Sequence, residues 1–302
     1  MRQPADILCI GSVLWDVIGR SASHMAAGSD VPGRITQIPG GVALNIAMTC
    51  ARLGLRPALL SAVGRDVQGD ALVAECASLG IETRYLYRSD DLPTDRYMAI
   101  EGANGLIAAI ADAHSLEYAG ARILTPLEDG ILGSADAPYA GQVALDGNLT
   151  TALLTRIADA AAFASADLRV APASPGKAER LLPFLKTGRA TLYVNLEEAG
   201  LLCNTRFEGA AAAARGLLER GAARVLVTDG ARTACDGRAD GLIEATPPPV
   251  LVTRVTGAGD TFMAAHMVAE RHGPEHRRAD RADALARALQ TAASYVSGDT
   301  AL

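Results

Sequence analysis

A glycine-rich segment near the carboxyl end of the chain joins an anion-binding backbone to a carboxylate. Gly257-Ala258-Gly259-Asp260 is followed at once by an apolar run from Thr261 to Val268. This order predicts a helix with Thr256 as its N-cap and Asp260 in its first turn. Backbone N–H groups at such a helix start bind anions. The pattern therefore favours phosphoryl transfer, with the carboxylate accepting a proton from the attacking hydroxyl.

Paired glycines precede a second apolar helix pattern. Gly40 and Gly41 follow Pro39, and Asn45 lies four residues after Gly41 on the same predicted helix face, where its amide would reach a hydroxyl group. The alternative is a glycine turn before a core helix that tolerates an asparagine. Asp16 follows the first apolar run, at a strand end where open α/β sheets bind ligands. It would hold sugar hydroxyls, unless it is only a turn residue.

Two more polar positions follow predicted strands. Asn195 and Glu198, three residues apart at a helix start, would hold a hydrated Mg²⁺ ion or its phosphate ligands. Glu198 could equally be a favourable charge at a helix start. Thr228 and Gly230 end the next apolar run and would face a nucleotide, although an ordinary β-turn has the same pattern.

The elements that must position these residues alternate along the chain. Strand patterns and helix patterns in turn indicate an α/β fold around a mainly parallel sheet. We expect core strands near residues 6–11, 57–62, 142–146, 168–171, 190–195 and 223–228. We expect helices over residues 42–53, 68–79, 150–164, 208–220 and 280–296.

Two stretches, residues 13–38 and 82–112, interrupt this alternation. Their turn residues and short alternating segments predict antiparallel strands that project from the main body. A small sheet beside a ligand crevice would act as a lid that excludes water, whereas the alternative is a surface hairpin without that role. No composition change marks a domain boundary, so we expect residues 1–302 to form one domain with these stretches as lid insertions.

Composition and motifs argue against several other classes of protein. With a net charge of −6 the chain has no general basic field for nucleic acid or acidic lipid, and acids interrupt its basic run at 271–287, which predicts a solvated helix face. Five widely spaced cysteines argue against a disulfide framework or a zinc site. The chain has no P-loop, and a missing third glycine after Gly259 disfavours a dinucleotide fingerprint. Without a signal-peptide or membrane-spanning pattern, we expect a cytoplasmic protein.

The ordered set formed by Gly40-Gly41, Asn45, Asn195, Glu198 and Gly257-Ala258-Gly259-Asp260 resembles the PfkB, or ribokinase-like, family of small-molecule kinases. The resemblance covers essentially the whole chain. It implies a three-layer α/β/α core with a mainly parallel sheet and a small β-sheet lid. It also implies ATP as the phosphate donor, Mg²⁺ as the helper ion, a small nucleoside or sugar as the acceptor, and a homodimer formed through the lids.

The same resemblance implies a role for each matching residue. Asp260 would be the catalytic base, and the backbone of Gly257, Ala258 and Gly259 would form the anion hole. The residues that would bind the acceptor are Asp16, Gly40, Gly41, Asn45, Thr94, Arg96 and Asn148. The residues that would bind ATP are Asn195, Thr228 and Gly230, while Glu198 would hold Mg²⁺ through water.

Within the family, four segments are most similar to pseudouridine kinases: Pro32-Gly33-Arg34-Ile35, Pro39-Gly40-Gly41-Val42, Thr94-Asp95-Arg96-Tyr97 and Asp146-Gly147-Asn148-Leu149. Pseudouridine kinases phosphorylate the 5′-hydroxyl of a C-linked ribonucleoside, so the resemblance implies this reaction. Two alternatives stay open. One is a kinase of the same fold that acts on a free sugar or another nucleoside, and the other is a non-catalytic protein that binds a sugar or nucleoside.

Arg254 departs from the family pattern. Many family members have an aspartate at this position, which helps to form a site for a monovalent cation. We hypothesise that the guanidinium of Arg254 removes or replaces that site with a fixed positive charge, so that activity depends little on K⁺.

Overall fold

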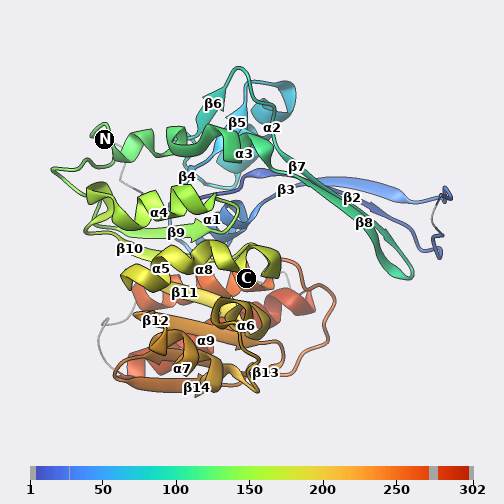
Figure 1. Cartoon of the computed structure of the whole chain (residues 1–302). Helices are drawn as coiled ribbons and strands as arrows, with labels where there is room; N and C mark the ends of the chain where they lie inside the picture. The colour runs from blue at the N-terminus through green and yellow to red at the C-terminus, as the bar shows by residue number, and fades with distance from the viewer. Residues whose placement is uncertain (1–4, 27, 272–277, 299–302) are drawn as a thin grey trace.

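The computed structural model describes residues 5–26, 28–271 and 278–298, and its main body is built on one large sheet (Figure 1). Within these residues the sheet has eight strands in the order β14-β13-β12-β11-β10-β9-β1-β4. The strands are β1 (Ile7–Ile10), β4 (Pro57–Leu60), β9 (Gln142–Asp146), β10 (Asp167–Ala171), β11 (Ala190–Asn195), β12 (Arg224–Asp229), β13 (Arg232–Arg238) and β14 (Gly241–Ala245). The first six are parallel and confirm the predicted core strands, while β13 and β14 add an antiparallel edge that was not predicted.

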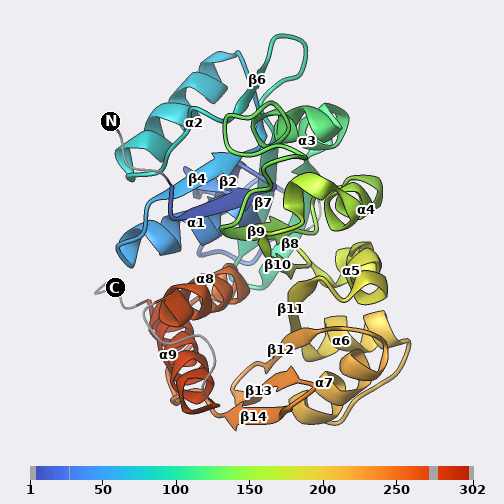
Figure 2. The same cartoon turned by 90° about the vertical axis from the view of Figure 1, so that its left-hand side faces the viewer.

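Helices cover both faces of this sheet and complete a three-layer architecture (Figure 2). One face carries α1 (Val42–Arg52), α2 (Val67–Ser78), α8 (Ala258–Arg271) and α9 (Arg278–Ser297). The other carries α3 (His114–Ala119), α4 (Thr151–Asp159), α5 (Leu182–Thr187), α6 (Leu196–Cys203) and α7 (Ala210–Glu219), with the 3₁₀ helices η1 (Gly120–Leu127), η2 (Ala161–Phe163) and η3 (Pro175–Leu181). The central strands are buried from both sides, which explains their continuous apolar sequences.

The helices predicted over five residue ranges correspond to α1, α2, α4, α7 and α9, and the helix predicted at Asp260 corresponds to α8. The end of the third is wrong, because α4 stops at Asp159 where residues up to 164 were expected. Ala160 is extended there, with φ −71° and ψ 136°, and the chain continues as η2. Alanine composition alone does not reveal this break, since alanine favours a helix throughout the segment.

A separate sheet of four strands projects from the main body as a lid (Figure 1). Its order is β3-β2-β7-β8, with strands β2 (Leu14–Arg20), β3 (Arg34–Gly40), β7 (Arg96–Gly102) and β8 (Gly105–Asp112). Two hairpins, β2-β3 and β7-β8, are antiparallel as predicted, but the central pair β2-β7 is parallel. The parallel pair arises because each hairpin begins with a strand that leaves the main body.

The second lid stretch is also shorter than predicted. Residues 82–95 do not join the lid sheet, since β6 (Tyr87–Ser89) pairs with β5 (Ala62–Gly64) in a sheet of its own. The lid strand therefore begins at Arg96. Pairing partners of this kind are distant in sequence, so a pattern along one strand does not disclose them.

A buried ion network lies between the sheet and helices α8 and α9. Asp236 is fully buried and accepts from Arg224 at 2.7 Å and from Arg281 at 3.1 Å. Arg224 also contacts Glu270 at 2.6 Å. Arg281 lies within the basic run that was predicted to be a solvated helix face, yet the exposed fraction of Arg281 is only 4%. That prediction is wrong for Arg281, because a charged residue can be buried when a carboxylate of another element pairs with it.

The five cysteines are free thiols, and four of them are buried. Among the described helices, none combines the length and the apolar character needed to cross a membrane. The absence of disulfides agrees with the interpretation of the cysteine spacing.

Candidate active site

Polar residues gather at the carboxyl ends of the central parallel strands. Asp146 ends β9, and Asn195 ends β11. Thr228, near the end of β12, pairs in register with Asn195. Because parallel strands end at the same edge of a sheet, these residues share one edge, which is where open α/β sheets bind ligands. The amino-terminal parts of α1 and α8 supply Asn45 and Asp260.

The start of α8 differs by one residue from its prediction. The helix begins at Ala258, and the carbonyl oxygen of Gly257 accepts the first helical hydrogen bond, from the N–H of Thr261 at 2.9 Å. The N-cap position is therefore Gly257 and not Thr256. Gly257 has φ +84°, a conformation that favours glycine. Asp260 lies in the first turn, as predicted.

The three amides that were predicted to form an anion hole do not have equal surroundings. The N–H of Ala258 donates to the carbonyl oxygen of Val255 at 3.0 Å, so it closes a turn within the loop. Beside Gly259 the space is open, since a Cβ atom built there would meet nothing within 4 Å. A phosphate group can therefore approach the backbone at Gly259, where the positive end of the helix points.

Asp260 receives a hydrogen bond from a residue 215 positions earlier. Nδ2 of Asn45, on α1, donates to Oδ2 of Asp260 at 2.8 Å. Burial raises the pKa of Asp260 to about 7; the hydrogen bond from Asn45 opposes this rise, and the carboxylates of Asp146 and Asp16 add to it. A carboxyl group with this pKa exchanges its proton near neutral pH, which is what a general base requires.

Both predicted glycines before α1 are required by close packing. A Cβ at Gly40 would lie 2.1 Å from Oδ2 of Asp16, and a Cβ at Gly41 would lie 2.5 Å from the carbonyl oxygen of Ser12. Gly41 also has φ +100°, in the region that favours glycine. The glycine pair thus lets the chain pass directly over the Asp16 carboxylate, and burial raises the pKa of Asp16 to about 6.

Asp146 is the principal residue whose role was not predicted. It is fully buried, and its carboxylate accepts from Ser12 N at 2.8 Å, Ser12 Oγ at 2.9 Å, Ala43 N at 3.0 Å and Asn148 N at 2.7 Å. Burial raises its pKa, and these donors oppose the rise. Asp146 therefore ties the end of β1, the first turn of α1 and the loop after β9 together. Its signal in the sequence is a carboxylate that ends a buried strand and is followed by Gly147.

Asn148, a predicted acceptor residue, is held in a defined orientation. Its Nδ2 donates to Ser12 Oγ at 2.9 Å, and its Oδ1 accepts from Nζ of Lys177. Lys177 belongs to η3 and was not predicted; burial lowers its pKa, and the nearby Arg180 adds to this effect. Lys177 brings a cation to the strand ends that otherwise carry the carboxylates.

Asn195 and Glu198 form a capping box at the start of α6. Oδ1 of Asn195 accepts from the N–H of Glu198 at 2.9 Å, and Oε2 of Glu198 accepts from the N–H of Asn195 at 2.8 Å. Glu198 is only 6% exposed; burial raises its pKa to about 7, and the charges of Glu197 and Asp260 contribute. Carboxylate oxygens are ligands that Mg²⁺ prefers, and the capping box uses only Oε2 of Glu198. Among the described residues, no group of three or more His, Cys, Asp or Glu side chains is placed to hold a metal ion.

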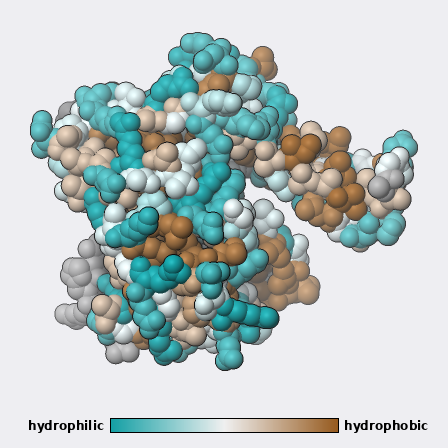
Figure 3. Space-filling view, in the orientation of Figure 1, coloured by the Kyte–Doolittle hydropathy of each residue, from teal (hydrophilic) through white to brown (hydrophobic). Residues whose placement is uncertain are grey.

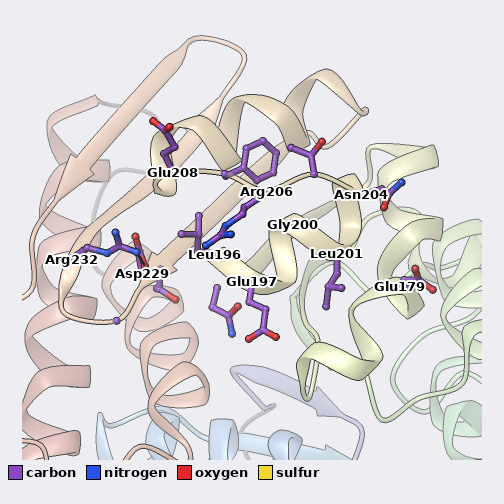
Figure 4. A pocket seen from close by; sticks show the side chains of 15 residues that line it. Glu179, Leu196, Glu197, Gly200, Leu201, Asn204, Arg206, Glu208, Asp229 and Arg232 are labelled. Atoms are coloured by element: carbon purple, nitrogen blue, oxygen red, sulfur yellow. Dashed lines mark hydrogen bonds and ion pairs between the residues drawn. The ribbon is translucent and has the colours of Figure 1, made fainter.

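The three predicted ATP residues, Asn195, Thr228 and Gly230, line one groove of about 1350 Å³ beside α6. Figure 4 shows this groove with other lining residues, such as Leu196 and Arg206, labelled. Apolar side chains such as Leu196 also line it, and its charged lining residues are Arg206, Arg232, Glu179, Glu197, Glu208 and Asp229. The apolar side chains suit a ligand with an apolar ring, and the two arginines are the groups that could meet its anionic part.

The lid does not bring Thr94 or Arg96 to the site in the predicted way. Thr94 is 3% exposed, and its N–H and hydroxyl donate to the Asp66 carboxylate at 2.8 and 2.7 Å, next to the start of α2. Arg96 is in register with Trp15, whereas Tyr97 is in register with Asp16. Successive residues of a strand point to opposite faces, so Tyr97 shares the face of Asp16 and Arg96 does not.

Comparison with known proteins identifies the family. The profile of the pfkB family carbohydrate kinases matches residues 4–299. The chain belongs to the PfkB family. Pseudouridine kinase of Escherichia coli is 29% identical over 269 residues, which are 87% of this chain and 83% of that protein. Pseudouridine kinase of Arabidopsis thaliana is 27% identical over 178 residues, or 59% of this chain. The chain spans 45% of the Arabidopsis protein, and 39% of an uncharacterized E. coli sugar kinase that is 32% identical over 147 residues.

Solved structures confirm the ribokinase-like fold over almost the whole chain. A carbohydrate kinase from Agrobacterium tumefaciens has a TM-score of 0.80 and 27% identity, and the similarity covers 98% of this chain and 92% of that one. Arabidopsis thaliana ribokinase, solved with ribose and ATP, has a TM-score of 0.76 and 18% identity, covering 97% and 93%. The chain therefore has the ribokinase-like fold over almost its whole length.

Proposed function

We propose that the protein is an ATP-dependent kinase that phosphorylates the 5′-hydroxyl of a ribosyl nucleoside, with pseudouridine as the acceptor. The observation that carries this proposal is the contact between Asn45 and Asp260 at 2.8 Å, which unites the two glycine motifs of the chain. The pKa of Asp260, about 7, supports its role as the base. Relatives that are named pseudouridine kinase support the choice of acceptor.

In this proposal Asp260 accepts the proton of the attacking hydroxyl while Asn45 holds its carboxylate. The helix start at Gly257 and Gly259 stabilises charge on the transferred phosphoryl group. When bound, ATP supplies that group and Mg²⁺ balances the charge of its phosphates. Asn195 would contact the phosphates and Glu198 would hold the ion through water, while the groove at Thr228 and Gly230 would take the nucleotide.

We place the ribose of the acceptor at Asp16 and Asn45, since a carboxylate and an amide together bind hydroxyl groups. Tyr97 would cover the acceptor from the lid, because it lies on the same sheet face as Asp16. Asn148 and Lys177 would meet polar atoms of the base. A carboxylate cluster repels an acceptor that already carries phosphate, which favours an uncharged nucleoside over a sugar phosphate.

A steady-state assay tests the reaction. Release of ADP is measured with pseudouridine, uridine, adenosine, ribose and hexose phosphates, and phosphorus NMR locates the phosphate in the product. We expect the highest kcat/KM with pseudouridine and a 5′-phosphate. A higher kcat/KM with a free sugar or another nucleoside would contradict pseudouridine as the acceptor but would still support kinase activity. Absence of ADP release with every acceptor would favour a non-catalytic binding protein of the same fold.

We also propose a homodimer formed through the lids. The lid face opposite Asp16 exposes Ile35 (76%), Met98 (47%) and Ile110 (67%), and Figure 3 shows hydrophobic surface on the projecting lid. Sheet edges and apolar faces of this kind are protected when two copies pair. Analytical ultracentrifugation should give a dimer that Met98→Glu weakens, and a monomeric wild-type protein at micromolar concentration would contradict the proposal.

The free thiols suit the reducing cytoplasm, which is the location we propose.

A further inference from the structure

The loop before α8 is fastened to the last turn of α9. The N–H groups of Thr253 and Arg254 donate to the carbonyl oxygen of Val296 at 2.8 and 3.2 Å, and Nε of Arg254 donates to the carbonyl oxygen of Tyr295 at 2.7 Å. The last carbonyls of a helix have no partner within the helix and carry partial negative charge. Arg254 therefore supplies a positive charge and donors where α9 ends.

Tyr295 holds the same loop at its other end. The guanidinium carbon of Arg254 lies 3.9 Å from the centroid of the Tyr295 ring, in a cation–π contact. The hydroxyl of Tyr295 donates to the carbonyl oxygen of Thr256 at 2.8 Å. A Cβ at Gly257 would lie 2.6 Å from this hydroxyl, so the tyrosine packs directly against the turn that starts α8. Arg254 and Tyr295 together form a clasp across residues 253–257.

These residues do not fit the monovalent cation that the fold family implies at position 254. A cation site needs a carboxylate or free carbonyl oxygens, but this position carries a guanidinium that is itself positive. The carbonyl oxygen of Tyr295 already accepts from that guanidinium. The second carbonyl oxygen nearby, that of Val296, receives donors from Thr253 and Arg254. A K⁺ ion at this place would meet like charge and occupied oxygens.

We infer that Arg254 is an internal cation that positions the phosphate-binding turn of α8, so that the protein works without K⁺. Arg254 acts through the turn and does not touch the reacting atoms, which makes it a positioning residue. The inference rests on the proposed kinase function for its kinetic readout. Its binding readout, the affinity for ADP, does not depend on which acceptor is correct.

The first experiment compares the wild-type protein in K⁺ and in tetramethylammonium, a cation too large for a protein site. We expect kcat and the Kd of ADP, measured by calorimetry, to change less than twofold between the two salts. The melting temperature should change by less than one degree. A fivefold loss of activity or ADP affinity in tetramethylammonium would overturn the inference.

The second experiment removes the clasp. Arg254→Ala should weaken ADP binding and lower kcat by about tenfold, since a charged hydrogen bond and a stacked ring are lost. Added guanidinium ion at millimolar concentration should restore part of both, whereas Arg287→Ala, at an exposed ion pair of α9, should change neither and respond to no additive. Rescue distinguishes positioning by charge from a general loss of structure.

Arg254→Gln is the second variant if Arg254→Ala fails to fold. It keeps a donor for Tyr295 but removes the charge, and we expect it to show a defect in ADP binding close to that of alanine. Normal ADP binding by a folded Arg254→Ala or Arg254→Gln protein would overturn the inference. If no acceptor is phosphorylated while ADP binding still depends on Arg254, the proposed function fails but the role of Arg254 stands.

Discussion

Replacement of Asn45 by alanine tests the central contact of the site. Nδ2 of Asn45 stabilises the charged form of Asp260 by a hydrogen bond of 2.8 Å. Without this hydrogen bond, burial and the carboxylates of Asp146 and Asp16 still raise the pKa of Asp260, and the opposing effect of Asn45 is lost. Asn45→Ala should therefore raise the pKa of Asp260 above its value of about 7. The base is then protonated up to a higher pH.

The size of the effect follows from the hydrogen bond that is lost. A hydrogen bond to a charged group contributes about 1.5–3 kcal/mol, and one pH unit corresponds to about 1.4 kcal/mol, so the pKa of Asp260 rises by roughly one to two pH units. At pH 7 the deprotonated fraction falls from about one half to between roughly one tenth and one hundredth. The expected loss of kcat/KM at pH 7 is about 5- to 50-fold, and most of it is recovered above roughly pH 9.

The assay is a profile of kcat/KM against pH from 5 to 10, with the acceptor varied and ATP saturating. Asn45 also contacts the acceptor in our proposal, and loss of that contact lowers the whole profile without moving it. Only the loss of the hydrogen bond to Asp260 moves the acidic limb. Asn104→Ala, in the exposed turn of the lid, is the control and should leave the profile unchanged. An acidic limb that stays in place in Asn45→Ala would refute the assignment of Asp260 as the titrating base.

Three further outcomes are expected. Asp260→Asn should lower kcat by roughly 10²–10⁴-fold with little change in the affinity for ATP or acceptor. Near-normal turnover of this variant in steady-state kinetics would contradict the role of Asp260 as the catalytic base. Gly40→Ala should raise KM for the acceptor while KM for ATP stays constant, because a Cβ at Gly40 would lie 2.1 Å from the carboxylate of Asp16; equal changes in both constants would contradict this. The pKa of Asp236 is lowered from 3.8 to about 2, so its stabilising contribution is complete above about pH 4 and is lost as the pH falls towards 2. Asp236→Asn should lower the free energy of unfolding by about 3–5 kcal/mol at pH 7 and by clearly less at pH 2.5, as urea titrations would show.

Most of the core could be predicted because its signals are local. A parallel strand that is buried on both faces needs a continuous apolar run, and each of the six predicted runs is a strand of the main sheet. The helix at Asp260 follows from glycines before an apolar run. The edge strands β13 and β14 were missed, since charged residues such as Asp236 and Arg238 interrupt their apolar pattern.

The lid marks where local patterns stop being informative. Its strands alternate, which predicts a sheet, but neither the pairing partner nor the face follows from the pattern. Register decides that Tyr97 and not Arg96 accompanies Asp16. A contact with α2 likewise decides that Thr94 bonds to Asp66.

Local patterns in the sequence predict the six central strands, the glycine turns and the carboxylate at the start of α8, because each depends on residues close together in the chain. Which of these groups meet depends on the tertiary fold. Asn45 reaches Asp260 across 215 positions, Asp146 binds Ser12 across 134, and Arg254 reaches Tyr295 across 41. Whether a carboxylate is buried, and hence whether its pKa lies near neutrality, depends on such distant neighbours. The glycine motif is therefore visible in the sequence, but the near-neutral pKa of Asp260 and the clasp at Arg254 exist only in the folded chain.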